Sequence, residues 1–443
     1  MTRPDASLDH VTPYDRLAFS DVQVEHLLAT GEHSRELIAY FGETEYRKLA
    51  SLVRTARESP LPADAPRVVI VPGIMGSNLG STRTAPLPND VLWLDPVDIE
   101  MGHLKRLRLP ATSPIVSLGI VLYSYLRLKL HLRIAGCAPV FHDYDWRLGI
   151  DELGRGLAAR LEKEDGARLM VVAHSMGGLV SRAAMATASG RKVKRVVLLG
   201  TPNFGSFAPV QALRGTYAVV RKIARLAETQ SAELLAADIF STFPSLYHLL
   251  PLSEVSPKLD FFDPASWPAS GPQPDVRLLE HARKLGKSLA PGDERFAVIV
   301  GAGQETVTRA KRVGNEFQYT ITRHGDGTVP TACAVLPGAS TYYTTVAHSE
   351  LARDEVVARS IADLLHTGTT KRLKSKLARP GAAEARITDA ELRRTHTEKV
   401  RWAGLEADAR RVFLQTLNEP PKLRLRLPVA KKKVAHKNPR RRK

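Results

Sequence analysis

The stretch that decides the fold is Leu169-Met170-Val171-Val172-Ala173-His174-Ser175-Met176-Gly177-Gly178-Leu179-Val180. It begins with an apolar run that is typical of a buried strand, and from Met176 onward its apolar residues recur at helical spacing. Between the two lies a turn of small residues with Ser175 at its tip. Such a turn lifts the serine hydroxyl above the sheet and has no room for bulky side chains two positions away. The segment therefore predicts a nucleophile elbow, with Ala173 in place of the usual first glycine.

Further short apolar runs occur on both sides of this segment, with helical patterns between them. They lie at residues 68–71, 138–141, 196–200, 296–301, 317–322 and 342–346. Strands that alternate with helices predict an α/β fold with a mostly parallel sheet and helices on both faces. In such a sheet, functional residues gather at the carboxyl ends of the strands.

The other segments extend or interrupt this core. We expect an N-terminal helical extension, a core in two parts, a helical cap between them, a charged linker with one helix from Asp389 to Leu417, and a disordered basic tail. The corresponding ranges are 1–66, 67–206 with 276–367, 207–275, 368–420 and 421–443. The apolar faces within the cap fit either helix packing or docking on a membrane, and the pattern favours packing.

The charge of the chain is concentrated at one end. The 443 residues carry a net charge of +18, and the 421–443 tail alone holds eleven Lys and Arg and no acid. About +7 therefore remains for all the other residues, so the basic character says little about the chemistry of the core. A basic tail fits peripheral contact with an anionic membrane. Nucleic acid is not expected as a partner, and the sequence does not indicate an oligomeric state.

Targeting signals and metal motifs are not evident in the sequence. The first ten residues hold Asp5 and Asp9 and no apolar run, which argues against a secretory signal. The uncharged stretch 109–126 contains Pro110, Pro114 and Gly119, which argues against a membrane span. The expected location is the cytoplasm. Two cysteines cannot build a disulfide framework or a cysteine-based zinc site, and we expect neither metal nor cofactor.

A serine nucleophile needs a base within hydrogen-bond reach, and the base needs an orienting acid. In this kind of fold the three follow in the order serine, acid, histidine. His348 comes directly after the run 342–346, at the strand end where a base is required. His324 is the main competitor, in a loop two residues before an acid, while His366 fits a capping role at the end of the helix expected over 350–365.

The acid candidate is Asp326, in the segment Gly325-Asp326-Gly327-Thr328-Val329-Pro330. By itself this segment fits a plain Asp-Gly turn. Its place between Ser175 and His348, after the run 317–322, favours the catalytic acid instead.

Ester cleavage also needs donors for the oxyanion of the tetrahedral intermediate. We assign one to the amide of Met176, directly after the nucleophile, and the other to the amide of Ile74. Ile74 lies in the glycine-containing loop Pro72-Gly73-Ile74-Met75-Gly76-Ser77, which follows the first core strand. A phosphate-binding alternative fails because no Gly-Lys-Ser/Thr follows that loop.

Eight motifs, in order between about residues 68 and 351, resemble the lecithin:cholesterol acyltransferase family, which includes phospholipid:diacylglycerol acyltransferases and a lysosomal phospholipase. They are VPGIMGSNL (71–79), VLW (91–93), YDWR (144–147), AHSMGG (173–178), GTPNFGS (200–206), FPSLY (243–247), GDGTVP (325–330) and His348.

The resemblance implies an α/β-hydrolase with Ser175, Asp326 and His348 as its triad, and an oxyanion hole from Ile74 and Met176. It further implies lipid acyl esters as substrates and transfer of the acyl group to water or to an alcohol. Extracellular members carry a cysteine-closed loop near the residue that corresponds to Trp93, and this chain has no cysteine there. Trp93 fits either a core aromatic or a wall of the substrate site.

Two alternatives stay open. YDWR (144–147) fits a structural role, with Arg147 paired to an acid, better than a substrate contact. For the whole chain, the expected function is a lipid-directed serine hydrolase or O-acyltransferase. The alternative is a noncatalytic hydrolase-like protein that attaches to anionic lipid or nucleic acid through its basic tail.

Overall fold

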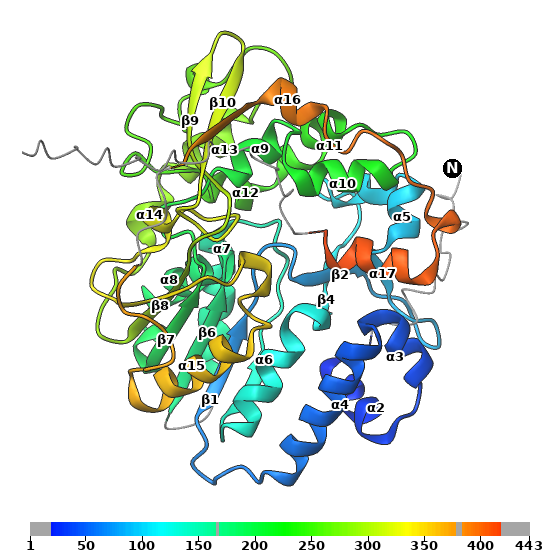
Figure 1. Ribbon diagram of the computed structural model, residues 1–443, viewed down its shortest axis with the longest axis vertical. Coiled ribbons are helices and arrows are strands. Elements are labelled where there is room, and N and C mark those ends of the chain that lie inside the picture. The colour runs from blue at the N-terminus through cyan, green and yellow to red at the C-terminus, as the bar shows by residue number, and fades with distance from the viewer. Residues whose placement is uncertain (1–18, 165–167, 378–382, 418–443) are drawn as a thin grey trace, which may run out of the picture.

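A six-stranded parallel sheet forms the centre of the computed structural model, which describes residues 19–164, 168–377 and 383–417 (Figure 1). The sheet order is β11-β8-β7-β6-β1-β5. Its strands are β1 (Arg67–Val71), β5 (Ala138–Phe141), β6 (Leu169–His174), β7 (Val193–Leu199), β8 (Phe296–Gly301) and β11 (Ser340–Thr344). The predicted α/β fold with a parallel sheet is confirmed. The predicted basic tail, 421–443, lies outside the described residues.

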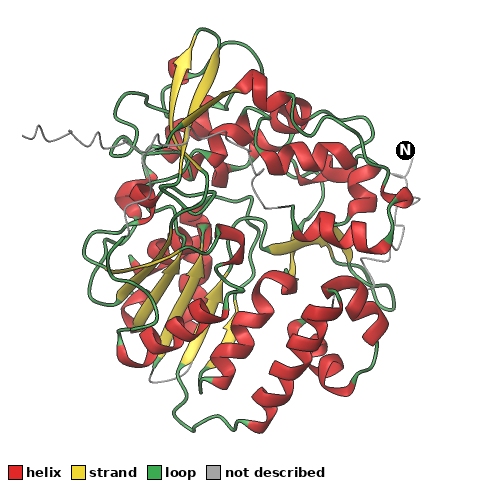
Figure 2. Cartoon of the chain, in the orientation of Figure 1, coloured by secondary structure: helices red, strands yellow, loops and turns green. Residues whose placement is uncertain are grey.

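Helices cover both faces of this sheet because its strands are apolar on both sides (Figure 2). In β1, Val68 and Ile70 pack with α4 (Glu43–Glu58), α6 (Leu122–Ile134) and α15 (Glu355–Thr367). Val69 and Val71 face the other way, toward α7 (Ile150–Lys163) and α8 (Met176–Met185). Two apolar cores therefore hold the sheet between two helical layers.

The helices before β1 and those between β7 and β8 cover the outside of the core. The first group is α2 (Asp21–Thr30), α3 (Ser34–Phe41) and α4. The second group is α9 (Ala208–Leu213), α10 (Ala218–Leu226), α11 (Ala232–Asp238), α12 (Pro244–His248) and α13 (Val276–Ala282). Within the predicted cap, the amphipathic stretch 210–226 is divided between α9 and α10 at Gly215, whose φ of 68° does not continue a helix.

The run 317–322 was predicted as a strand of the parallel sheet, and this is wrong. It forms β10 (Glu316–Thr322), the middle strand of a separate antiparallel sheet with β9 (Thr306–Val313) and β12 (Ala385–Thr388) (Figure 1). Only Gly314 and Asn315 separate β9 from β10. A link this short makes a hairpin, whereas a parallel crossover needs a dozen residues or more.

A third sheet, also not predicted, lies beside α6. It consists of β2 (Ser77–Ser81), β3 (Asp90–Trp93) and β4 (Val116–Ile120), paired antiparallel in the order β3-β2-β4. Short α5 (Pro96–Glu100) follows β3, and α14 (Thr331–Ala334) follows the loop that carries Asp326.

The single helix predicted from Asp389 to Leu417 is wrong. The segment forms α16 (Asp389–Arg393), a 3₁₀ turn at Trp402–Gly404 and α17 (Ala407–Gln415). Between these two elements the chain forms hydrogen bonds with the cap. The Val400 amide donates to the Arg225 carbonyl, and Lys399 Nζ donates to one carbonyl in the last turn of α10 and to two in the segment after it. The helix predicted from 350 begins later, at Glu355, where the Asp354 side chain caps it.

A buried ion pair joins this C-terminal segment to the cap. Arg214 and Asp389 are both fully buried, with Nε and Oδ2 3.2 Å apart. The same carboxylate accepts hydrogen bonds from the Phe317 amide at 3.2 Å and from the Tyr319 hydroxyl at 2.8 Å. Asp389 therefore ties β10, the cap and α16 together at one point.

No helix in the described ranges is long and apolar enough to cross a bilayer. Part of the uncharged stretch 109–126 forms β4 and the start of α6.

Candidate active site

Ser175 occupies the turn between β6 and α8, with φ 53° and ψ −127°. A positive φ is a strained conformation for a serine, and such strain persists only where the surroundings enforce it. Here close packing enforces it. A Cβ on Gly177 would lie 2.3 Å from the Pro72 carbonyl oxygen, and one on Gly178 would lie 1.9 Å from Thr201 Oγ1. The small residues of the turn therefore let α8 press against the loop after β1 and hold the serine at its tip.

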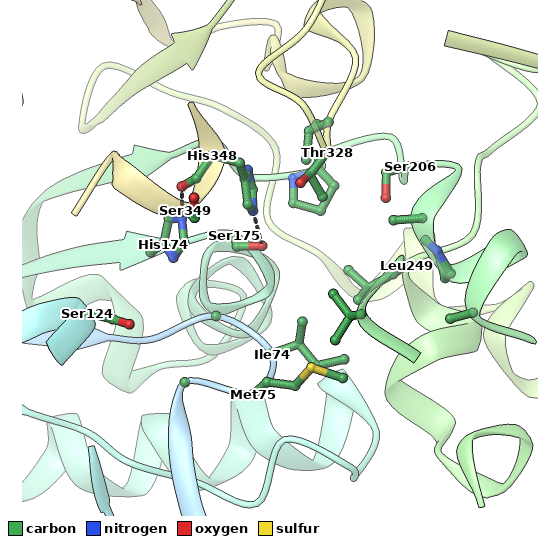
Figure 3. Close-up of a pocket in the computed structure, with 18 of the residues that line it drawn as sticks. Ile74, Met75, Ser124, His174, Ser175, Ser206, Leu249, Thr328, His348 and Ser349 are labelled. Carbon is green, nitrogen blue, oxygen red and sulfur yellow. Dashed lines mark hydrogen bonds between the residues drawn. The ribbon is translucent and has the colours of Figure 1, made fainter. Parts of the chain in front are cut away.

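His348 connects the serine to an acid (Figure 3). Its Nε2 lies 2.9 Å from Ser175 Oγ, and its Nδ1 lies 2.7 Å from Asp326 Oδ2. An ionised carboxylate only accepts hydrogen bonds, so the proton of the neutral imidazole belongs on Nδ1. Nε2 is then free to accept the serine hydroxyl proton, as a general base must.

Asp326 is fixed by backbone donors. It is 1% exposed, and its Oδ1 accepts hydrogen bonds from the amides of Thr328 at 3.0 Å and Val329 at 2.7 Å. Its own carbonyl accepts from the His348 amide at 2.9 Å. Asp326 follows β10, but its loop returns to the central sheet. There it packs against the end of β8, where a Cβ added to Gly301 would lie only 2.5 Å from Asp326 Cβ. The acid therefore follows the strand predicted for it, but that strand belongs to the antiparallel sheet, and the loop after it brings the acid to the central sheet.

The two competing histidines lie elsewhere. His324 is exposed, and His366 at the end of α15 lies with its Nε2 2.9 Å from the Ala135 carbonyl, which belongs to the end of α6. The structure thus brings together Ser175, Asp326 and His348, and leaves both alternatives outside the site.

The loop assigned to the oxyanion hole runs directly against the nucleophile. A Cβ on Gly73 would lie 2.9 Å from Ser175 Cβ, and Ile74 and Met75 line the same pocket as the serine (Figure 3). Met176 is the first residue of α8, where an amide has no acceptor within the helix. The backbone at Ile74 and Met176 therefore borders the nucleophile on two sides, as two oxyanion donors require.

A buried hydrogen-bond network that the sequence did not reveal supports this geometry. The Gly73 amide donates to the Tyr125 hydroxyl at 2.9 Å, and that hydroxyl lies 2.9 Å from His174 Nδ1. His174 Nε2 in turn lies 3.0 Å from the carbonyl of His348. Burial lowers the pKa of His174 to about 3, so the ring is neutral and its proton belongs on Nε2, facing the carbonyl. One chain of bonds thus links the oxyanion loop, the elbow and the base.

Replacing Tyr125 by phenylalanine is expected to lower kcat about tenfold and to leave KM within about threefold. The substitution leaves the Gly73 amide and His174 Nδ1 buried without partners, which costs roughly 1–3 kcal/mol and loosens the oxyanion loop. Steady-state kinetics on a short-chain ester measure the effect, with Tyr46→Phe on α4, away from the site, as the control. Equal kinetics for Tyr125→Phe and the parent protein would contradict the role of the network.

Ser175 opens into an apolar pocket, here named the cap pocket, that encloses about 1160 Å³ including its open mouth. Its apolar wall comes from the cap: Ala212, Val219, Val220, Phe240, Leu246 and Leu249. Ser206 and Thr328 add polar groups to the rim (Figure 3). A hydrocarbon chain bound there would have its carboxyl end at the serine.

Trp93 lies behind this pocket instead of in it. It is 1% exposed, its ring packs edge-on against Trp146 at 5.2 Å, and it borders a second pocket, here named the Trp93 pocket. This second pocket shares Met75, Tyr123 and Ser124 with the cap pocket. Of the two roles left open for it, Trp93 therefore has that of a core aromatic: it does not line the pocket that opens at Ser175, and it borders the neighbouring pocket instead.

YDWR (144–147) is engaged in internal contacts. Arg147 is buried and donates to both carboxylate oxygens of Asp145, at 2.9 and 2.6 Å, and to the Leu107 carbonyl at 2.8 Å. Tyr144 donates to the Pro72 carbonyl at 2.5 Å. These contacts favour a structural role for YDWR over a substrate contact, because the motif is bonded internally and Tyr144 holds the backbone at the start of the oxyanion loop.

One cluster of possible metal ligands exists among the described residues, formed by Asp151, His248 and His281. His248 Nδ1 accepts a hydrogen bond from the Ile150 amide at 2.9 Å. The neutral ring must therefore carry its proton on Nε2, which lies 3.1 Å from His281 Nδ1. The arrangement is a hydrogen-bonded pair of histidines, and it does not fit a metal ion.

The free energy of unfolding is expected to fall as the pH is lowered from about 6.5 to about 4. Burial lowers the pKa of His142 and of His248 from 6.5 to about 4 and that of His174 to about 3. Across this range the unfolded chain binds protons that the folded chain does not, so acid favours unfolding by roughly 3 kcal/mol for each fully shifted histidine. Urea titrations at several pH values measure the free energy of unfolding. The variant His248→Asn keeps an acceptor for the Ile150 amide, and its free energy of unfolding should depend less on pH than that of the parent. A free energy independent of pH over this range would contradict the prediction.

A parallel sheet with a strained serine at the end of one strand, next to a histidine and a carboxylate, defines the α/β-hydrolase class. The lecithin:cholesterol acyltransferase family model matches residues 140–273. The resemblance inferred from the motifs is confirmed over that stretch, which includes the elbow and most of the cap. No curated protein matches this chain.

Several solved structures are similar at low identity. The mature lipase BlEst2 of Bacillus licheniformis has 15% identity and a TM-score of 0.37, over 69% of this chain and 94% of that chain. The Tle4–Tli4 complex gives 14% identity and a TM-score of 0.44, over 69% and 98%. Phospholipase PlaB of Legionella pneumophila gives 12% identity and a TM-score of 0.32, over 69% and 61%.

Proposed function

We propose that the protein is a lipid-directed serine hydrolase or O-acyltransferase that works through an acyl-serine intermediate. The family match supports the broader class of lipid acyl hydrolases and acyltransferases. The observation that carries the finer proposal is the continuous relay from Ser175 Oγ through His348 to Asp326, at 2.9 and 2.7 Å, at the mouth of an apolar pocket.

The proposed reaction begins when Ser175 Oγ attacks the acyl carbonyl carbon and its proton moves to His348 Nε2. Asp326 stabilises the resulting imidazolium, and the amides of Ile74 and Met176 hold the negative carbonyl oxygen. The tetrahedral intermediate then collapses: the C–O bond to the alcohol breaks, and His348 returns the proton to that alcohol. Water or a second alcohol repeats the sequence on the acyl-serine and releases a fatty acid or a new ester.

The cap pocket supports a long acyl group as the substrate. Its apolar wall is contributed by cap residues such as Val220, Phe240 and Leu249, and it leads to the serine. Each methylene buried there contributes roughly 0.8 kcal/mol, so esters of long fatty acids should bind more tightly than acetates. Trp93 is not part of this wall.

Labelling with a fluorophosphonate probe tests the proposal directly. The activated Ser175 oxygen should displace fluoride and form a phosphonyl ester on the folded protein, which intact mass and peptide mapping detect. Ser175→Ala should not react, and neither should the heat-denatured parent. Failure of the folded parent to react would favour the alternative, a noncatalytic hydrolase-like binding protein.

A further inference from the structure

We propose that a small monovalent anion of the size of chloride binds inside the protein, between the guanidinium groups of Arg214 and Arg393 and beside Gly271. The site lies where the cap meets α16, at the junction that Asp389 also holds (Figure 1). The inference goes beyond the proposed function and does not depend on it, because none of its three residues lines the cap pocket.

Two buried guanidinium nitrogens at this junction need an acceptor. Arg214 is fully buried, with its Nε 3.2 Å from Asp389, and its Nη1 donates to the carbonyls of Pro272 at 2.8 Å and Pro268 at 3.3 Å. Its Nη2, however, has no hydrogen-bond partner among the described residues, and neither has Nη2 of Arg393. A buried donor without a partner destabilises the folded state, so the two nitrogens mark a place where a ligand would be held.

Both unpaired nitrogens border one small space. A Cβ on Gly271 would lie 3.0 Å from Arg393 Nη2 and 3.3 Å from Arg214 Nη2. The space exists because residue 271 has no side chain, and its φ of 78° is one that glycine adopts without strain. The two nitrogens are therefore close enough to each other to donate to a single ion between them. A monatomic anion suits this geometry, since it accepts hydrogen bonds from any direction.

The balance of charge favours an anion over a water molecule. The ion pairs at this junction join three arginines to two acids, and the nearby Glu316 accepts the Ala390 amide at 3.0 Å. One positive charge is therefore in excess. A water molecule would complete the hydrogen bonds, but only an anion would also neutralise this charge. The paired groups are Arg214, Arg221 and Arg393 with Asp389 and Glu233.

The surroundings make an excess charge costly. The guanidinium of Arg214 lies over the ring of Phe317, 6.0 Å from its centroid, and both side chains are fully buried. A charge that is removed from water and not compensated strongly destabilises a protein. Asp389 accepts from Nε of Arg214, so an anion at Nη2 adds to that ion pair and does not replace it.

The first experiment measures the stability of the full chain while chloride replaces a bulky anion. Urea unfolding is followed by tryptophan fluorescence in mixtures of sodium chloride and sodium gluconate at constant ionic strength, which keeps general screening constant. Chloride that binds only the folded state should lower the unfolding equilibrium constant, by about a hundredfold at a hundredfold excess over its Kd. Stability that does not depend on chloride would overturn the inference and leave water as the acceptor.

Two variants test whether the effect arises at this site. Arg393→Met removes one of the two donors and should lower the affinity for chloride at least tenfold. Gly271→Asp places a carboxylate beside both guanidinium groups, and aspartate visits positive φ more readily than most residues. Its stability should no longer depend on chloride. The matched control is Arg394→Met, at the next and exposed position, which should keep the parent dependence. A chloride effect that both site variants retain would overturn the inference.

Diffraction with bromide tests the position of the ion without a measurement of stability. Bromide resembles chloride in charge and chemistry, and its anomalous scattering distinguishes it from water. Crystals of the full chain soaked in sodium bromide should show an anomalous peak between Nη2 of Arg214 and Nη2 of Arg393, and crystals of Gly271→Asp should not. A map of the parent without this peak would contradict the site. A peak without any chloride effect in solution would show binding at crystal concentration only, and would equally contradict it.

Discussion

Replacing Ser175 by alanine is expected to lower kcat for ester hydrolysis by about 10³-fold to 10⁶-fold. The substitution removes the oxygen that forms the acyl intermediate, and it leaves the oxyanion loop and the cap pocket in place. KM should change far less, because the groups that bind substrate are still present. Stopped and continuous assays on a p-nitrophenyl ester measure the loss.

Ser253→Ala is the matched control, since Ser253 is an exposed serine in the cap segment. It should retain the parent activity. A second variant separates chemistry from folding: Asp326→Asn keeps the size of the side chain but places an amide against His348 Nδ1, and about 10³-fold to 10⁴-fold of kcat should be lost. Turnover at the parent rate in Ser175→Ala would remove this serine from the mechanism.

The Asp389→Asn variant is expected to lose roughly 3–5 kcal/mol of unfolding free energy, because the buried Arg214 guanidinium would keep its charge without a counterion. Asp389 and Arg214 are both fully buried, and the same carboxylate also accepts from Tyr319 and from the Phe317 amide. Removing the charge therefore disturbs the cap, β10 and α16 at once. Urea unfolding followed by tryptophan fluorescence measures the change.

An exposed ion pair provides the comparison. Asp408 pairs with Arg411 at 2.8 Å but its side chain is 83% exposed, so Asp408→Asn should change the free energy by less than about 1 kcal/mol. Replacing both buried partners, as in Arg214→Met with Asp389→Leu, should recover much of the loss. If Asp389→Asn and Asp408→Asn were equally stable, the buried pair would not be a structural anchor.

The elbow could be predicted because its signals are local. A buried apolar run, a turn of small residues and a helical pattern occur within the twelve residues from Leu169 to Val180, and each restricts the backbone by itself. The chain order serine, acid, histidine, which is typical of this fold, then left few candidates for the acid and the base, among them Asp326 and His348. The parallel sheet followed from the same alternation of strands and helices, and the structure confirms it.

The errors arise where tertiary contacts decide. In the run 317–322 apolar and polar residues alternate, and β10 is buried at Phe317, Tyr319 and Ile321 but only partly buried between them. This alternation fits an antiparallel strand better than a central parallel one, and tertiary pairing decides that its partners are β9 and β12. The helical pattern from Asp389 to Leu417 is interrupted where Lys399 and Val400 find partners on α10. The role of Tyr125 was missed for the same reason, since Gly73 and His174 are 52 and 49 residues away along the chain.

The pairing of β12 with β10 decides how far the chain can be shortened for crystallisation. The register from Gln318↔Thr388 to Ile321↔Ala385 covers one long side of β10. A truncated protein ending at residue 367 would expose that side, and a bare strand edge is a template for association with another molecule. Such a truncation is expected to aggregate, whereas one that retains residues up to 417 keeps the edge covered.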